Sequence, residues 1–473
     1  MRKESPPTIL QLLGLAFGLG ISLISLGTFY LAYGQIQLRS STIALFLAAL
    51  CLGLVGLNLL AGKRRLWKRH RHKEAESPFS KAELPEGPNL ERDPLLIGSP
   101  AKRASYLEIA MLSMIGAAVL IVLLDALSQP LLSFDARAIW GMKAQVIFSC
   151  QQIYGEDFFD PDRLHAKQRY PLGIPLAQSF MYHMIGHLDD RLGKIIFPGF
   201  FVALCLSFYA ALRHFFSRCY SLLGTFLLAI LPAFSIYANG GAASGYADVP
   251  LTYFYTVFAL SLFNWLWERR DSDLVLALVF GVFAVFTKNE GLALWGITVL
   301  CLALVGKSAG QPFSRNLGSL LFLAIASAVA LLPWYLYRSR LPLLEEDYFR
   351  LLTPAHLMAG IHRLPYLLKS FVREIFLRPQ LWSLLGPCLL LAFCASPSRA
   401  IRQRHGVFLW IALLYCVFLV MIYLVIPWTM EELIPVSLTR LLMPLTPILI
   451  LWMLFQMQAT SLLPERWTTP EPR

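Results

Sequence analysis

Two aspartates stand at the edges of long apolar runs, where a carboxylate can do chemistry. Asp135 follows an apolar run at about 107–128 and opens a stretch that carries Arg137 and Lys143. At the membrane exit the dielectric falls steeply, so a carboxylate there can retain the basicity needed to accept a proton from a hydroxyl group. An N-cap aspartate that opens a short interfacial helix is the competing interpretation. The sequence leaves both open.

The second aspartate, Asp248, ends a glycine-rich turn at 239–248 and begins the next apolar run. Glycines let the backbone approach a ligand, and a carboxylate at a helix N-terminus is favoured by the helix dipole. Capping alone explains Asp248 as well as a functional role does. Glycine-rich polar backbone at membrane depth, however, is tolerated chiefly where it lines a cavity.

Cations follow in the same long loop, at 129–192. Lys167 and Arg169 lie beside Tyr170, just before the chain re-enters the membrane. Arginine can hold a phosphate through two parallel N–H donors, and lysine can hold it as a point charge. Snorkelling of both side chains to lipid headgroups explains the pattern equally well. His183 and His187 lie four residues apart, but no intervening acid or third ligand accompanies them, so we expect no metal site there.

Two later motifs add charge at what we expect to be the same side. Lys288 and Glu290 interrupt an apolar stretch from about 274 to 305, and a pairing of the two across the turn explains them about as well as function does. Arg440 stands at the mouth of the last apolar run, where snorkelling is again an alternative.

The elements that position these residues follow from composition. Of 473 residues 57% are hydrophobic and 15% are charged, which is typical of a membrane protein. Backbone polar groups in hydrocarbon must be satisfied within the segment, so apolar runs of about 20 residues predict helices rather than barrel strands. The fold class is therefore all-α and polytopic. The net charge of +12 is explained by cytoplasmic loops beside anionic headgroups rather than by nucleic acid. The eight cysteines show no disulfide framework and no metal-binding pattern.

About twelve transmembrane helices are predicted from the apolar runs. They fall at roughly 8–34, 42–62, 107–128, 193–213, 219–237, 249–267, 274–287, 291–306, 317–337, 381–396, 407–427 and 440–458. The first is a retained anchor, since no signal-peptide cleavage site follows it.

The basic cluster 63–73 marks the cytoplasm, and 74–100 reads as a disordered linker. The predicted organisation is two N-terminal transmembrane helices at 1–62, a basic cytoplasmic linker at 63–104, a transmembrane core at 105–460 and a cytoplasmic tail at 461–473. By parity, loops near 213–218, 268–273, 307–315 and 399–404 return to the cytoplasm, and every site motif lies on the other side.

Taken together, these motifs resemble the GT-C superfamily of polytopic glycosyltransferases, particularly the bacterial branch near the protein O-mannosyltransferases and lipid A aminoarabinose transferases. The resemblance covers roughly 105–450 and rests on the order and common side of five motifs. These are Phe134-Asp135-Ala136-Arg137, Tyr170-Pro171-Leu172-Gly173-Ile174-Pro175, Tyr246-Ala247-Asp248-Val249-Pro250, Lys288-Asn289-Glu290-Gly291 and Thr439-Arg440-Leu441-Leu442-Met443-Pro444-Leu445. It implies extracytoplasmic interfacial helices in the first long loop.

The resemblance also implies roles. Asp135 resembles the family's catalytic base, and Asp248 resembles a second acid that orients acceptor or donor. The cations expected to hold the donor phosphate are Arg137, Lys143, Lys167, Arg169 and Arg440, with Tyr170, Lys288 and Glu290 in support. Two departures are that Ala136 rather than a second acid follows Asp135, and that two extra helices precede the core. A lone carboxylate is a poor divalent-cation site, so no metal and no other cofactor is expected.

The expected function is inverting transfer of a hexose or pentose from a polyprenyl-phosphate donor to a lipid, glycan or protein acceptor. The expected place is the outer face of the bacterial inner membrane. A lipid-linked glycan polymerase or ligase is an alternative with similar chemistry. A secondary transporter is another, although it would put ionisable residues in mid-helix and show an internal repeat. A structural assembly protein that keeps the fold without activity is the third.

Overall fold

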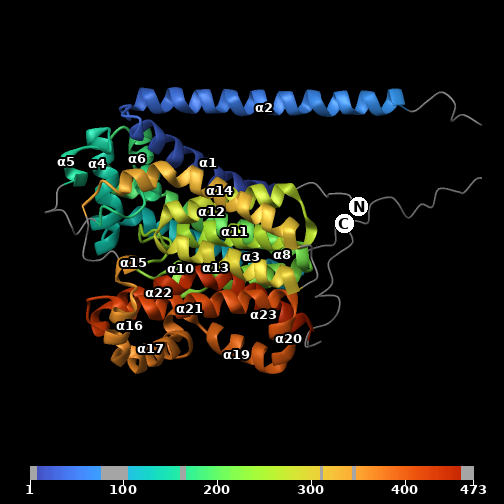
Figure 1. Ribbon diagram of the computed structural model, residues 1–473, viewed down its shortest axis with the longest axis vertical. Helices are drawn as coiled ribbons and strands as arrows, with labels where there is room; N and C mark the ends of the chain where they lie inside the picture. The colour runs from blue at the N-terminus through green and yellow to red at the C-terminus, as the bar shows by residue number, and fades with distance from the viewer. Residues whose placement is uncertain (1–7, 76–104, 160–166, 309–312, 343–347, 460–473) are drawn as a thin grey trace, which may run out of the picture. The chain divides into compact units, whose positions relative to one another are not determined.

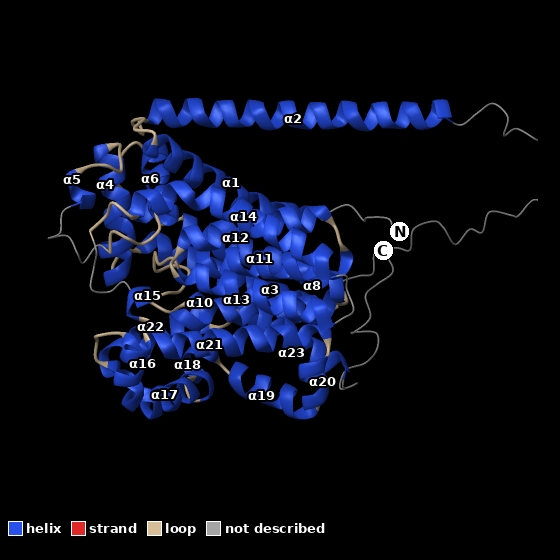
Figure 2. Ribbon diagram, in the orientation of Figure 1, coloured by secondary structure: helices blue, strands red, loops and turns tan. Residues whose placement is uncertain are grey.

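Helices are the only regular secondary structure in the described part of the chain (Figure 2). The computed structural model describes residues 8–75, 105–159, 167–308, 313–342 and 348–459. The prediction of an all-α fold is thereby confirmed. The chain divides into a large unit, Met1–Leu38 with Leu107–Arg473, and a small unit, Arg39–Tyr106.

The helices are distributed along the whole chain (Figure 1). The N-terminal ones are α1 (Ile9–Tyr33), α2 (Ser40–Ala75) and α3 (Tyr106–Ser128). Next come η3 (Ala136–Gly141), α4 (Met142–Cys150), α5 (Glu156–Phe159), α6 (Gly173–Ile185), α7 (Asp190–Gly193), α8 (Ile196–Phe215), α9 (Arg218–Ala229) and α10 (Pro232–Ser235). The central helices are α11 (Asp248–Glu268), α12 (Asp271–Thr287), α13 (Glu290–Ser308) and α14 (Phe313–Arg338). The last are α15 (Tyr348–Leu351), α16 (Pro354–Gly360), η5 (Ile361–Arg363), α17 (Leu364–Phe376), α18 (Pro379–Trp382), α19 (Leu385–Ala395), α20 (Pro397–Arg402), η6 (Arg404–Gly406), α21 (Val407–Val425), α22 (Met430–Leu442), η7 (Met443–Leu445) and α23 (Thr446–Ala459).

Seven helical segments of the described residues are long and apolar enough to cross a membrane. They are Ile9–Tyr33, Tyr106–Ser128, Asp190–Phe215, Asp248–Glu268, Asn316–Arg338, Arg404–Val425 and Met430–Gln458. The chain is thus a polytopic membrane protein. Several other apolar runs form shorter helices: α9, with 12 residues, stops before Pro232, and such a helix covers only about 18 Å. The count of about twelve spans therefore stays a prediction.

Helix α11 forms the core of the large unit, packed against α8, α12 and α13. Nearly all its residues are buried, and Tyr253 and Phe254 make ring contacts with Phe280 of α12. Because α11 and α12 are consecutive and joined by a short turn, they run antiparallel. The start of α11 and the end of α12 consequently lie at one end of the bundle, here called the site end, and the α11–α12 turn lies at the far end.

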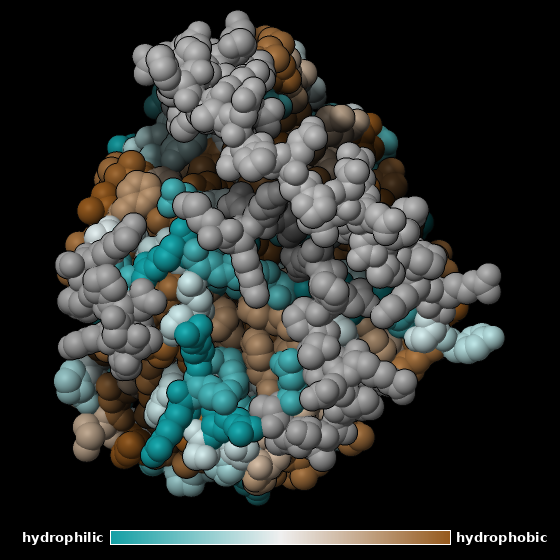
Figure 3. Space-filling view, turned by 90° about the vertical axis from the view of Figure 1, so that its right-hand side faces the viewer, coloured by the Kyte–Doolittle hydropathy of each residue, from teal (hydrophilic) through white to brown (hydrophobic). Residues whose placement is uncertain are grey.

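All four loops predicted to share the far end do meet there. His214 binds Glu268, which also pairs with Arg270. Further far-end contacts are Arg269 with Asn316, and Arg404 over the Trp267 ring at 4.2 Å. Hydrophilic side chains gather over the middle of this face of the large unit, with hydrophobic ones along its margins (Figure 3). The parity argument is therefore confirmed as far as which loops lie together.

The first long loop contains short helices, as predicted, and their position at a membrane interface stays a prediction. Helices α4, α5 and α6 lie together at the site end of the large unit (Figure 1). In the small unit, α2 continues to Ala75, so no helix ends at the domain boundary predicted at residue 62. The predicted linker beyond residue 75 and the tail at 461–473 lie outside the described residues.

Candidate functional site

Five of the residues singled out in the sequence form one charged cluster at the site end, here called the Arg440 network: Asp135, Asp248, Lys288, Glu290 and Arg440. Arg440 Nη1 donates to Asp135 Oδ2 at 2.6 Å across 305 residues of sequence. It also lies 4.0 Å from Asp248 Oδ2. Lys288 Nζ donates to Asp248 Oδ1 at 2.9 Å and lies 3.2 Å from Glu290 Oε1. Lys288 therefore pairs with Asp248 as well as with its neighbour across the turn.

Helix capping does not account for either aspartate. Asp135 has helical backbone angles, φ −64° and ψ −34°, and its side chain makes no capping hydrogen bond. Asp248 is the first residue of α11 and its cap is Ala247, again without a side-chain capping bond. Both carboxylates point to cations instead. The turn after Asp135 is π-helical, a distortion frequent at functional sites.

Tyr246 supports the network and was not assigned a role from the sequence. Its hydroxyl accepts a hydrogen bond from the Asp135 backbone N–H at 3.4 Å, and the Arg440 guanidinium lies 4.8 Å from its ring centroid. Burial, and then the charge of Asp135, raise the pKa of Tyr246 to about 12, so it acts as a neutral hydroxyl. In the sequence, the position of Tyr246 two residues before Asp248 was the feature that could have indicated this role.

The glycine-rich turn makes room for Arg440, a contact that the sequence interpretation did not include. Gly240 has φ +149°, and a Cβ there would lie 2.8 Å from Arg440 Cγ. Gly245, at φ +82°, packs against Leu131, which lies in one buried cluster with Ala136 and Tyr246. The turn thus fixes both the guanidinium and the backbone that precedes Asp248.

The network is buried at one side and open at the other. The Asp248 side chain is 1% exposed, whereas that of Asp135 is 25% exposed. Burial opposes the charge of Lys288, but Asp248 and Glu290 outweigh it and raise the pKa of Lys288. Three carboxylates face two cations. Buried oxygens Asp248 Oδ2 and Glu290 Oε2 and the nitrogen Arg440 Nε find no hydrogen-bond partner among the described residues, so the network has capacity to bind further groups.

A second cationic group surrounds Tyr170. Lys143 Nζ donates to the Lys167 carbonyl at 2.6 Å, and the two ammonium groups lie 5.9 and 5.8 Å from the Tyr170 ring centroid. Trp140 packs against the same ring at 5.8 Å. Lys143 is 2% exposed, and burial, followed by the charge of Lys167, holds its pKa well below the ordinary value. A bound anion would favour the charged form here.

The five cations expected to hold a donor phosphate are therefore divided. Arg440 lies with the acids, and Lys143 and Lys167 lie around Tyr170. Arg169 Nη1 donates to the Leu341 carbonyl at 3.3 Å, and Arg137 is exposed one turn beyond Asp135. Lys143 follows Asp135 by eight residues on the continuous helix η3–α4, a rise of roughly 10–12 Å. The two groups are thus neighbours along one element.

Of the two histidines, His183 occupies a packing position and His187 is exposed. The His183 ring contacts Phe148 at 4.8 Å between centroids, and burial lowers the pKa of His183. Within the described ranges, no group of three or more His, Cys, Asp or Glu side chains is placed to hold a metal ion.

A second buried acid, Glu374 of α17, was also missed. Its carboxylate accepts hydrogen bonds from Arg378 at 2.7 Å, Trp382 at 2.9 Å and Thr439 at 2.5 Å. In the sequence it is the one acid among five Lys and Arg residues between 348 and 378, which was the available signal.

No protein-family model matches the sequence, and no curated protein matches it. The Arg440 network and the Tyr170 group are therefore the features from which a function can be inferred.

Proposed function

We propose that the protein is a membrane glycosyltransferase that moves a sugar from a polyprenyl-phosphate donor to an acceptor hydroxyl on the extracytoplasmic face. The observation that carries the proposal is the Arg440 network: a part-exposed acid, Asp135, and a buried acid, Asp248, meet one guanidinium at one end of a bundle of apolar helices. Such a reaction needs a base, cations for the leaving phosphate and access from lipid at one interface.

In this proposal Asp135 is the general base. Arg440 holds Oδ2, so Oδ1 is the oxygen that takes the acceptor proton. The acceptor oxygen then forms a bond to the anomeric carbon, and the bond from that carbon to the phosphate oxygen breaks with inversion. The electron pair leaves with the polyprenyl phosphate, whose charge is neutralised by Lys143 and Lys167. Arginine and lysine clamps on a departing phosphate are a recurrent form of such stabilisation.

In this proposal Asp248, Lys288 and Glu290 position Arg440 and do not themselves react. Asp248 is almost completely buried and lies within reach of both Lys288 and Arg440. It therefore helps to fix the guanidinium nitrogen Nη1 that also contacts Asp135. The GT-C likeness, the placing of the site end outside the cytoplasm, the bacterial inner membrane and the total of about twelve spans all belong to the same proposal.

A secondary transporter is the less favoured candidate. Asp248 opens α11, Lys288 stands between α12 and α13, and Asp135 precedes η3, so the acids lie at helix ends and not in mid-membrane as an ion pathway would require. A lipid-linked glycan polymerase or ligase uses the same donor chemistry, and the two differ in the acceptor alone.

The direct experiment is transfer of radiolabelled sugar by the purified full-length protein in proteoliposomes, offered a panel of polyprenyl-phosphate sugars. We expect label in a new product with one of these donors, and none with the Asp135→Asn variant. Absence of transfer from every donor and acceptor, together with uptake of a solute into the vesicles, would replace the enzyme by the transporter.

The side of the membrane has its own test. Gln168 is unsuitable for thiol labelling after replacement by cysteine, because its side chain is 1% exposed. The native Cys150 of α4 is exposed. An impermeant thiol reagent applied to intact cells is expected to label the wild type and to lose that label in Cys150→Ser. Labelling of Cys150 after cell lysis alone would put the site end in the cytoplasm.

A further inference from the structure

The segment Pro354–Phe376, formed by α16, η5 and α17, carries a stripe of exposed apolar side chains. Met358, Ile361, Leu368 and Val372 are 69%, 48%, 54% and 54% exposed. Leu368 and Val372, four residues apart, lie on one face of α17, and Met358 and Ile361 precede them on α16 and η5. Leu367, Phe371 and Glu374 form the buried side of α17, and the stripe flanks that side on the exposed surface.

A row of basic residues follows the stripe along one edge. His362, Lys369 and Arg373 are exposed, each one position after a member of the stripe. Among the residues 348–378 the single acid, Glu374, is buried and already bonded to Arg378. The exposed surface of this segment therefore consists of the apolar stripe and a row of basic side chains beside it.

Other exposed apolar faces of the large unit differ in this respect. Helices α3 and α14 expose many leucines and isoleucines, but their charged residues lie near their ends, as lipid-spanning helices require. Helix α17 has only 13 residues, and Lys369 and Arg373 lie within it. Its length and charge fit a helix that lies along a membrane surface rather than one that spans it.

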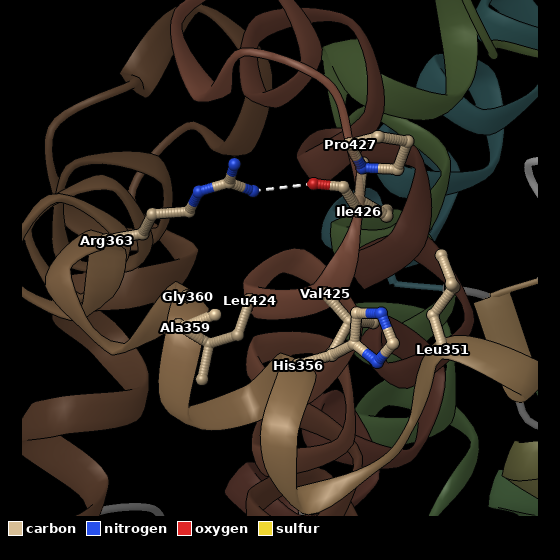
Figure 4. Close-up of a pocket in the computed structure, with 9 residues that line it drawn as sticks. All are labelled: Leu351, His356, Ala359, Gly360, Arg363, Leu424, Val425, Ile426 and Pro427. Carbon is tan, nitrogen blue, oxygen red and sulfur yellow. Dashed lines mark hydrogen bonds between the residues drawn. The ribbon is translucent and has the colours of Figure 1, made fainter.

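Beside the stripe, a cavity of about 460 Å³ opens between α16 and the end of α21 (Figure 4). Arg363 and His356 supply its polar groups, and its walls include Leu351, Leu424 and Pro427. Arg363 Nη1 donates to the Ile426 carbonyl at 2.6 Å, so the guanidinium is held in position with four of its five N–H donors remaining. The His356 ring is oriented through Nδ1 by Thr353 Oγ1 at 2.7 Å.

We propose that this segment binds anionic lipid: the stripe lies in the boundary of the acyl chains, and the cavity takes a lipid phosphate on Arg363 and His356. A guanidinium with donors to spare suits a phosphate, and leucine-lined walls suit the adjoining glycerol and acyl carbons. Lys369 and Arg373 then face neighbouring headgroups. A free phosphate would leave the apolar stripe without a function, and the basic edge favours an anionic membrane over a protein partner. The proposal does not depend on glycosyl transfer.

The test is native mass spectrometry of the full-length protein from nanodiscs of phosphatidylcholine with and without phosphatidylglycerol. We expect retained phosphatidylglycerol adducts on the wild type and little retained phosphatidylcholine. Each basic residue near a membrane surface changes affinity about fivefold, so Lys369→Ala with Arg373→Ala together should lower it roughly 25-fold. Arg363→Gln should abolish the most strongly retained adduct. Arg402→Ala, on α20 at the far end, is the matched control and should change nothing.

The outcomes separate the sources of phosphate and guard against misfolding. If Arg363→Gln fails to fold, His356→Ala and the Lys369/Arg373 double variant still decide, because all three side chains are exposed and, among the described residues, hydrogen-bond only through His356 Nδ1 to Thr353 Oγ1. Equal retention of the two lipids, or equal retention by control and double variant, overturns the proposal. Complete displacement of lipid by inorganic phosphate would assign the cavity to a soluble anion and overturn it as well.

Discussion

Two adjacent residues of α22, Thr439 and Arg440, bind buried or part-buried acids in different ways. Thr439 donates to Glu374, whose two carboxylate oxygens accept three hydrogen bonds from Thr439, Trp382 and Arg378. Arg440 bridges Asp135 and Asp248, yet Asp248 Oδ2 and Arg440 Nε have no hydrogen-bond partner among the described residues. Glu374 therefore has hydrogen bonds to both of its oxygens and Asp248 does not, although both acids lie beside the same turn of α22.

The difference separates structure from function. A buried carboxylate whose hydrogen bonds are complete stabilises the packing of α17 on α22, and it has no capacity left for a ligand. Unsatisfied buried polar atoms cost stability and persist chiefly where they serve a ligand or a reaction. Asp135, at the exposed edge of the unsatisfied network, is the acid that a substrate can reach.

The largest expected effect is the loss of turnover in Asp135→Asn. The amide keeps the shape and can still meet Arg440, but it cannot take a proton. General-base contributions of about 10²–10⁴ in rate are expected to vanish from turnover while donor affinity stays near that of the wild type. Radiolabelled transfer and thermal unfolding of the same preparation are the two measurements. A folded Asp135→Asn protein with near-normal turnover would make Asp248 the next candidate.

Glu374→Gln should behave in the opposite way. Its three donors include the charged Arg378, whose side chain is 25% exposed and which loses its anion in the variant. Hydrogen bonds to a charged group contribute about 1.5–3 kcal/mol, so the unfolding temperature should fall. At a temperature where the variant is folded, its turnover should match that of the wild type. A stable Glu374→Gln with reduced turnover would move Glu374 into the functional site.

Arg440→Lys is expected to have an effect of intermediate size on turnover. An ammonium group is a compact point charge and cannot reproduce the planar guanidinium, whose Nη1 donates to Asp135 Oδ2 and lies 4.0 Å from Asp248 Oδ2. Losing one charge-assisted hydrogen bond of about 1.5–3 kcal/mol should slow turnover roughly 10- to 150-fold. Wild-type rates in Arg440→Lys would show that a positive charge is sufficient and that the fork is not needed.

Much of the fold was predictable because lipid imposes a simple rule on sequence. Apolar runs marked the helices, and parity along the chain correctly grouped the ends of α11, α12 and α14. Helix length was less predictable: α9 ends at Ala229 because Pro232 starts a new element, and an apolar composition alone does not reveal such a stop.

The acids and Lys288 of the network were predictable as ionic residues at one side, but their partners were not. Arg440 was assigned to a phosphate because the sequence does not show that a side chain 305 residues away lies 2.6 Å from Asp135. The glycines near Asp248 suggested a ligand because the close approach of Arg440 to Gly240 is a long-range contact. Glu374 was missed because its position as the one acid among basic residues does not reveal that its side chain is buried against α22.

The smallest expected effect concerns Lys143 and the dependence of stability on pH. Burial, then the charge of Lys167, lower the pKa of Lys143 from 10.5 in the folded protein. Between that lowered pKa and 10.5 the unfolded chain holds a proton that the folded protein has released. The unfolded state therefore binds more protons, and the free energy of unfolding rises with pH across that window. Lys143→Met removes the titration, so its unfolding temperature should rise less than that of the wild type between pH of about 8 and 10.

A bound polyprenyl phosphate should flatten the wild-type slope in the same way, because the anion restores the charge on Lys143. Parallel pH dependences of wild type and Lys143→Met would remove Lys143 from the phosphate site and leave Lys167 as its cation.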